Sequence, residues 1–365
     1  MEQTLRAYAA QLLRMANDIT ALADRVAAEA ATPVPPPPAP QPEPEPTPPV
    51  SQPEPTTPPA PPVPATLNRP LLGLAIPDGE MRTGTAAKIS RIRDLGVTAV
   101  RMDVRPETAL SQYDGVIRAL RDAGIDVLAI LGGNLKVATV PEAEAFARQV
   151  EQTVKWLADR GVSHVQWWNE PNHSSRITTP ENYARAIRLA YPAAKSVNPN
   201  VFCVAAGLSG INDSVNGHIS TVDWLRRSYA AGAKGQYDAQ AMHPYSYPYH
   251  LDNPADWTGW GNLTKRFRPF MEANGEGNLK VWATEAGFPT AGGTGNTEAN
   301  QKAMYADKLL AEIRKLPWLG PVFHYGLDDR GGVTTDAENW FGLYRPNGTA
   351  KPAAAALKAA VGQIK

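Results

Sequence analysis

Two short segments of this sequence place a glutamate where a buried strand would end. In the first, Trp168, Asn169 and Glu170 close a strand-like run. In the second, residues 280–287 read Lys-Val-Trp-Ala-Thr-Glu-Ala-Gly and bring Glu285 to the end of another. An indole offers a flat apolar surface on which a sugar ring can stack, and an amide can exchange hydrogen bonds with hydroxyl groups. Because paired carboxylates are the groups that cleave glycosidic bonds, these two glutamates are the first candidates for catalytic residues.

The segments that must position these residues alternate between strand-like and helix-like patterns from residue 67 to the C-terminus. Thr179-Pro180-Glu181 has the cap, the proline and the early acid that are typical of a helix start. The alternation predicts an α/β fold, a (β/α)8 TIM barrel. A doubly wound open sheet is the alternative, but such sheets normally carry a glycine-rich phosphate loop, and Gly132-Gly133-Asn134 is too short for one. The strand-like runs are 71–76, 99–103, 126–131, 164–169, 201–206, 239–242, 280–284 and 321–325, helices are expected to end at Gly96, Gly124, Gly161 and Gly232, and the last helix is expected over 352–364.

Polar side chains follow most of these strand-like runs. In a barrel of parallel strands the active site lies at the carboxyl ends of the strands, so the polar residues found there should lie close together. Besides the two glutamates, the candidates for substrate binding are Arg101, Asp103, Trp168, Asn169, His243, Tyr245, Tyr325, Asp328 and Trp340.

The joint order of these motifs resembles the clan A glycoside hydrolases, the 4/7 superfamily, with families 39 and 5 nearest. Asn-Glu-Pro at 169–171 resembles the acid/base motif of the clan, and the strand that ends in Glu285 resembles its nucleophile strand. His243-Pro244-Tyr245 resembles the motif after strand six, and Arg101 stands where the clan commonly has an arginine near the nucleophile. The segment 340–352 resembles the stretch that leads these barrels into their last helix. The sequence departs from the clan where strand eight ends in Phe323-His324-Tyr325 instead of a tryptophan, and strand three lacks a histidine.

The resemblance implies retaining hydrolysis of a polysaccharide or oligosaccharide. Glu170 would be the acid/base and Glu285 the nucleophile, with their carboxyls ~5–5.5 Å apart. Carboxyls so close cannot easily both ionise, so we expect Arg101 to keep Glu285 charged while Glu170 holds a proton. Tyr245 could donate to Glu285, and Asn169 is expected to bind the 2-hydroxyl of the sugar.

Plainer interpretations remain open for several of these residues. Asn-Glu-Pro alone could form a surface turn, and Arg101 and Asp103 could belong to a structural ion pair. His243 could be a buried structural histidine. Trp167 is expected in the core, because alternation along a strand places it on the face opposite Trp168. A carbohydrate-binding barrel that has lost its activity is the alternative function. No cofactor or metal is expected, because the six histidines are scattered and one cysteine makes no cysteine cluster.

The composition excludes several classes of protein. The 36 basic and 36 acidic residues balance, which argues against a nucleic-acid-binding protein. The single cysteine, Cys203, lies in an apolar run and is expected to be buried. No stretch is long and apolar enough for a transmembrane helix, and no secretory signal stands at the N-terminus. We therefore expect a virion-associated or extracellular protein that uses another export route, or a cytoplasmic one.

Two further segments precede the barrel. Residues 1–30 have apolar residues spaced alternately by three and four, which predicts an oligomerising coiled coil; an amphipathic helix packed on its own domain is the alternative. Residues 31–66 are rich in proline and are expected to form an extended spacer without a core. The proposed architecture is a homo-oligomer in which a spacer holds the catalytic barrel of residues 67–365 away from the coiled coil. The heptad positions are Leu5, Leu12, Ile19 and Val26 in one row and Tyr8, Met15 and Leu22 in the other.

Overall fold

The computed structural model describes residue 67 and residues 71–105, 107–133, 137–175, 178–253 and 255–364. The predicted coiled coil (1–30) and the proline-rich spacer (31–66) lie outside these ranges and stay predictions.

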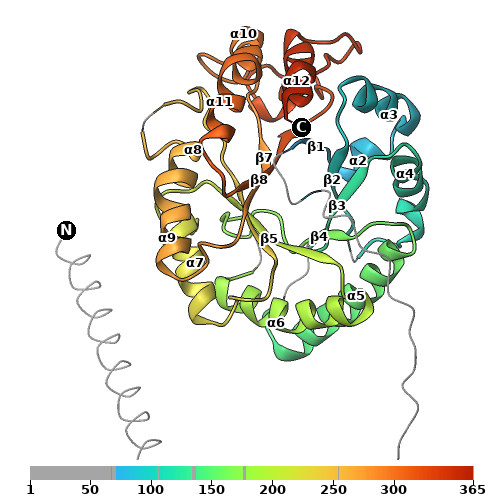
Figure 1. Cartoon of the computed structure of the whole chain (residues 1–365), viewed down its shortest axis with the longest axis vertical. Coiled ribbons are helices and arrows are strands. Elements are labelled where there is room, and N and C mark those ends of the chain that lie inside the picture. The colour runs from blue at the N-terminus through green and yellow to red at the C-terminus, as the bar shows by residue number, and fades with distance from the viewer. Residues whose placement is uncertain are drawn as a thin grey trace, which may run out of the picture. The chain divides into compact units, whose positions relative to one another are not determined.

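Eight parallel strands form a closed barrel in which neighbours in the chain are neighbours in the sheet and the first strand pairs with the last (Figure 1). The predicted (β/α)8 fold is confirmed. The strands are β1 (Leu72–Ala75), β2 (Ala99–Asp103), β3 (Asp126–Ile130), β4 (His164–Gln166), β5 (Phe202–Ser209), β6 (Ala239–His243), β7 (Val281–Ala286) and β8 (Leu319–Tyr325).

The helices form a ring around the strands, and at least one helix follows each strand (Figure 1). Their ends follow the local sequence: Thr179 caps the helix that begins at Pro180, and Gly96, Gly124, Gly161 and Gly232 adopt positive φ angles after the helices that they end. The helices are α2 (Asp78–Met81), α3 (Thr85–Asp94), α4 (Ser111–Asp122), α5 (Val140–Ala158), α6 (Pro180–Val197), α7 (Thr221–Ala230), α8 (Gly259–Asn262), α9 (Arg268–Ala273), α10 (Glu298–Ala303), α11 (Leu309–Arg314) and α12 (Pro352–Gln363), with π-helical turns η1 (Leu263–Phe267) and η2 (Met304–Lys308) and a 3-10 turn η3 (Ala337–Asn339).

The inside of the barrel is layered. Ala99, Ala241 and Trp282 belong to an apolar cluster that also contains Phe323, and the ring of His164 lies 6.1 Å from that of Trp282 in a tilted arrangement. Residues two positions further along a strand face the same side, so each of these strands presents a second inward residue above the apolar layer. These second residues are polar: Arg101, His243, Thr284 and Gln166.

Glycines make room for the large rings in the apolar layer. A Cβ atom at Gly320 would lie 2.6 Å from the indole of Trp282, and one at Gly73 would lie 2.5 Å from the ring of Phe323. These rings therefore fill the barrel interior and close it below the polar layer.

A larger apolar cluster fills the space between the strands and the helices. Cys203, fully buried there as expected, is a core residue. Within the described residues, no helix combines the length and the apolar character needed to cross a bilayer.

Candidate active site

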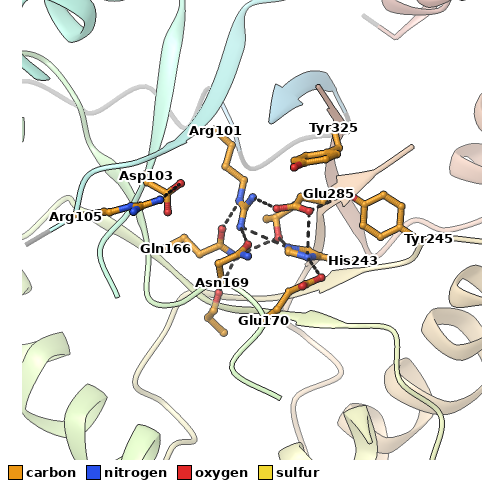
Figure 2. A network of polar contacts seen from close by, with 12 residues as sticks. Arg101, Asp103, Arg105, Gln166, Asn169, Glu170, His243, Tyr245, Glu285 and Tyr325 are labelled. Carbon is orange, nitrogen blue, oxygen red and sulfur yellow. Dashed lines mark hydrogen bonds and ion pairs between the residues drawn. The ribbon is translucent and has the colours of Figure 1, made fainter. Parts of the chain in front are cut away.

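Arg101 on β2 is the centre of a polar network at the carboxyl ends of the strands (Figure 2). Its guanidinium donates from Nη1 to Oε1 of Glu285 at 2.6 Å, from Nε to Oε1 of Gln166 at 2.6 Å, and from Nη2 to Oδ1 of Asn169 at 2.7 Å. The side chain is 3% exposed, so these charge-assisted bonds form away from water. Because a guanidinium can only donate, Oδ1 of Asn169 must face Arg101, which leaves its amide nitrogen as a donor for a ligand.

The other carboxylate oxygen of Glu285 accepts a hydrogen bond from Tyr245. The phenol oxygen lies 2.8 Å from Oε2. Burial, with the nearby charge of Glu285, raises the pKa of Tyr245 well above its usual value, so the phenol remains a donor at any physiological pH. Glu285 thus has one donor on each oxygen, and the two donors fix the orientation of its carboxylate.

Glu170 lies beside Glu285, and His243 contacts both (Figure 2). Nδ1 of His243 is 2.9 Å from Oε1 of Glu170 and 3.5 Å from Oε2 of Glu285. One oxygen of each glutamate and a ring nitrogen of His243 all lie within 4.8 Å of one another. Three such groups could surround a cation, but Arg101 already supplies a positive charge to Glu285. The charge of Glu285 is therefore already balanced by a side chain, and we assign no metal to the cluster.

The backbone of Glu170 is strained. Its φ angle is +43°, in the left-handed region that residues with a Cβ atom rarely adopt. Gly207 on β5 holds this conformation, because its carbonyl accepts from the amide of Glu170 at 2.8 Å and its amide donates to the carbonyl of Trp168 at 3.0 Å. In this conformation the carboxyl of Glu170 reaches His243 on β6. Strained backbone conformations of this kind are common at functional sites.

An irregularity in β7 brings two consecutive residues into the site. Thr284 contacts His243 and Glu285 contacts Arg101, although neighbours in a regular strand face opposite sides. The register between β7 and β8 shifts between Ala283 and Ala286, on either side of this pair. The shift turns both side chains inward.

A cavity of about 240 Å³ opens beside Glu285. Asp103 and Tyr325, both predicted, line it together with Arg105 and Arg330, while Glu170 does not. Burial raises the pKa of Asp103 even though Arg101 opposes this effect. Arg330 donates to the phenol oxygen of Tyr325 at 2.7 Å. The cavity is therefore rich in charged and hydrogen-bonding groups.

Trp168 does not present a face to this cavity. It is 3% exposed and packs against Phe146 of α5 and Tyr183 of α6, between the barrel and its helices. The expectation of a sugar-stacking indole assumed that strand alternation continues through Trp168, but β4 ends at Gln166 and the backbone then leaves strand geometry. The indole is a core residue, as is Trp167.

Asp328 and Trp340 have hydrogen-bond or ion-pair partners outside the network. Asp328 forms ion pairs with Arg91 and Lys88 of α3. Trp340 is half-buried and donates from its indole nitrogen to the carbonyl of Val333 at 3.1 Å. Neither residue lines the cavity beside Glu285.

Some residues of the site were not expected from the sequence. Gln166 and Thr284 join the network through side-chain hydrogen bonds, and Gly207 braces Glu170 through its backbone. The signal for Gln166 was its place inside β4 as a polar residue in an apolar run. The role of Gly207 depends on pairing between strands and left no local signal.

The structure can be compared with known proteins. The sequence matches no family model, and no curated protein is detectably similar to it. In structure the chain is similar to a family 39 glycoside hydrolase from Bacteroides cellulosilyticus WH2, with 23% identity, a TM-score of 0.64, and coverage of 82% of this chain and 64% of that one. It is also similar to a glucosidase from Croceicoccus marinus, with 14% identity, a TM-score of 0.59, and coverage of 82% and 68%. A third is a GH5_18 protein from Bifidobacterium longum subsp. infantis, with 16% identity, a TM-score of 0.56, and coverage of 82% and 79%.

The chain thus spans 64% of the length of the family 39 structure, and the likeness is one of architecture. Its barrel has the (β/α)8 fold found in these glycoside hydrolases.

Proposed function

We propose that this chain is a retaining glycosidase that cleaves a polysaccharide or oligosaccharide, with Glu285 as nucleophile and Glu170 as acid/base. The observation that carries the proposal is the closeness of the two carboxyl groups, which bring an oxygen each to within 4.8 Å. Retaining enzymes hold their carboxyls ~5–5.5 Å apart, whereas inverting enzymes leave ~6.5–9.5 Å for a water molecule.

In the first step an oxygen of Glu285 attacks the anomeric carbon. The bond from that carbon to the glycosidic oxygen breaks, and the proton of Glu170 moves to the departing oxygen. Arg101 and Tyr245 support this step, because their hydrogen bonds favour the charged carboxylate in the ground state and hold it in position for attack.

In the second step water releases the sugar from Glu285. Glu170, now a carboxylate, takes a proton from the water, whose oxygen attacks the same carbon while the ester bond to Glu285 breaks. The negative charge of Glu285 is absent in the ester, so the proximity of the two glutamates no longer opposes the ionised form of Glu170. Two inversions give net retention.

The cavity beside Glu285 fits the sugar that becomes bonded to the nucleophile. It is lined by Glu285 and Asn169 but not by Glu170, so the leaving group would lie on the other side, toward the acid. About 240 Å³ is less than the roughly 300–1,000 Å³ of typical ligand pockets, which suits one sugar unit. Because Arg105 and Arg330 stand in its wall, acidic sugars belong in any substrate panel.

The test uses the wild-type chain and Glu285→Gln on neutral and uronate-containing polysaccharides and on aryl glycosides, with reducing ends as the readout. We expect turnover by the wild type alone, and an azide-accelerated reaction of Glu170→Ala on activated aryl glycosides. A 2-deoxy-2-fluoro aryl glycoside of the sugar that is cleaved should leave its mass on the peptide that contains Glu285. Binding of glycan by both proteins without any turnover would instead support the inactive carbohydrate-binding barrel.

The arrangement of the whole chain is a separate proposal, supported by the sequence alone. Residues 1–30 would assemble several copies, and residues 31–66 would let each barrel reach its own site on a polymer, so that avidity strengthens binding. Such an arrangement suits a virion-associated or surface-displayed hydrolase. Deleting residues 1–30 should give a monomer with unchanged activity on small substrates; an oligomeric truncated protein would refute the coiled coil.

A further inference from the structure

Some groups of the polar network can only donate a hydrogen bond and others can only accept one. These groups determine which atom is the donor in each of the other hydrogen bonds. Arg101 can only donate, so the amide oxygen of Gln166 must face it. The amide nitrogen of Gln166 then faces the carbonyl of Ala205 at 3.2 Å, which can only accept, and Oγ1 of Thr284 at 3.1 Å. Both contacts require the same amide orientation, so Gln166 donates to the hydroxyl of Thr284.

The hydroxyl of Thr284 links Gln166 to His243, the histidine that contacts Glu170. Having accepted from Gln166, it has its own proton to donate to Nε2 of His243 at 3.1 Å. Nη2 of Arg101 also points a donor at Nε2, from 3.5 Å. An Nε2 atom that faces two donors is an acceptor, so the proton of a neutral imidazole sits on Nδ1, which donates to Glu170 at 2.9 Å.

The fold keeps space for this chain of hydrogen bonds. A Cβ atom at Gly207 would lie 2.3 Å from Nε2 of His243, 2.7 Å from Oγ1 of Thr284 and 2.9 Å from Nε2 of Gln166. The three polar atoms therefore occupy the space that the side chain of any residue other than glycine would need at position 207. His243 itself is fully buried, so no water competes for Nε2 from outside.

The charges around His243 give this arrangement a consequence for catalysis. Glu170 and Glu285 face Nδ1, Arg101 faces Nε2, and Tyr245 packs its ring against the imidazole edge. Two carboxyl groups would favour a doubly protonated imidazolium, and the extra proton would come from Glu170, its hydrogen-bonded neighbour. A hydroxyl donor and a guanidinium at Nε2 oppose that protonation.

We propose that Thr284, oriented by Gln166, is a positioning residue that keeps His243 neutral, so that the catalytic proton stays on Glu170 instead of passing to the histidine. The inference rests on the proposed glycosidase function, since it assigns a reason for the histidine beside the acid. Arg101 then has two roles. It binds the proposed nucleophile, Glu285, and through Gln166 it begins the series of hydrogen bonds that ends at Glu170.

The first experiment compares Thr284→Val, which removes the hydroxyl at nearly constant shape, with Thr284→Ser, which keeps it. For the valine variant we expect kcat on substrates with poor leaving groups to fall about tenfold or more, within the roughly 10²–10⁴-fold that general acid catalysis contributes. KM and the rate on activated aryl glycosides should change little, and the basic limb of the pH–rate profile should move to lower pH. The serine variant should restore both rate and profile.

A matched control is Thr153→Val, which removes a buried hydroxyl from α5, outside the network. It should leave the pH–rate profile unchanged. If Thr284→Val has the wild-type kcat and profile on poor leaving groups, or if the valine and serine variants are equally impaired, the role is packing or none, and the proposal is overturned.

The second experiment needs no turnover. Nitrogen-15 NMR of the imidazoles, with His243→Gln to identify the signal, distinguishes a nitrogen that carries a proton from a bare one. In the wild type near neutral pH we expect Nδ1 protonated and Nε2 bare, and in Thr284→Val a proton on Nε2 over part of that range. A protonated Nε2 in the wild type would overturn the proposal. An absence of turnover on every substrate would count against the proposed function while leaving this measurement decisive for the histidine.

Discussion

Replacing Glu170 by glycine should leave a more stable protein than replacing it by alanine, the reverse of the usual order. Both variants lose the carboxylate and its bond to His243, so the comparison isolates the Cβ atom. At φ +43° that atom costs roughly 1–2 kcal/mol. Glycine loses about 0.4–1 kcal/mol more than alanine in chain entropy on folding. The middles of these two ranges differ by about 0.8 kcal/mol, so the glycine variant should be more stable than the alanine variant by roughly that amount.

Ala355 provides the control, because it is an exposed residue inside α12. There the change from alanine to glycine should destabilise the protein by roughly 1 kcal/mol. Alanine has no strain at a helical φ angle, so only the larger entropy loss of glycine on folding remains. The two sites thus predict opposite signs for the same chemical difference.

Urea unfolding of the full chain, followed by circular dichroism, is the assay. Heat is less suitable, because 1 kcal/mol moves the midpoint of a barrel of this size by only ~2 °C. If glycine destabilises position 170 relative to alanine by as much as it does position 355, the backbone of Glu170 is not strained, and strain does not orient its carboxyl group.

Three further predictions concern ionisable groups that are buried or partly buried. Lys351→Met should destabilise the fold by about 3–5 kcal/mol in urea, because it leaves the carboxylate of Asp329 unpaired where both side chains are 1% exposed, and adding Asp329→Leu should recover most of the loss. Burial lowers the pKa of His164 to about 4, so the unfolded chain binds its proton first as pH falls from about 6.5; stability should drop over that window by up to about 3 kcal/mol, and His164→Gln should reduce the slope of unfolding free energy against pH. Burial raises the pKa of Asp103, so its ionisation opposes folding as pH rises; Asp103→Asn should raise the thermal midpoint at pH 8 but not at pH 3, whatever it does to activity.

Much of the fold could be predicted because each strand of a (β/α)8 barrel is a short apolar run followed by a helix with clear end signals. The bounds expected for the strand at 99–103 agree with β2 as observed. The strand expected to end at Ala206 continues instead to Ser209, through the register shift at Gly207. Apolar periodicity reports which residues are buried, and a shift of pairing between strands leaves no trace in it.

The candidate site was predictable to the extent that it depends on strand ends. Glu170, Glu285, Arg101, His243 and Tyr245 stand at such ends, and the structure brings them together. The roles of Gln166 and Thr284 arise from which residues of β4, β6 and β7 lie at one height inside the barrel. That height is set by pairing among strands far apart in the chain, so a local pattern could mark Gln166 as a polar residue in a buried strand but could not reveal its partners.

The pairing of β1 with β8 has a consequence for how the protein is made. Leu72 pairs with Val322 and Ala75 with Tyr325, so the strand that leaves the ribosome first finds one of its neighbours only when nearly the whole chain has followed. Contacts of such long range slow folding, and until they form the nascent barrel has two open edges that can pair with other chains. Ala75 and Tyr325 also line the cavity beside Glu285. The cavity is therefore among the last parts of the molecule to form, and an incomplete chain released early would carry both glutamates without the cavity beside them.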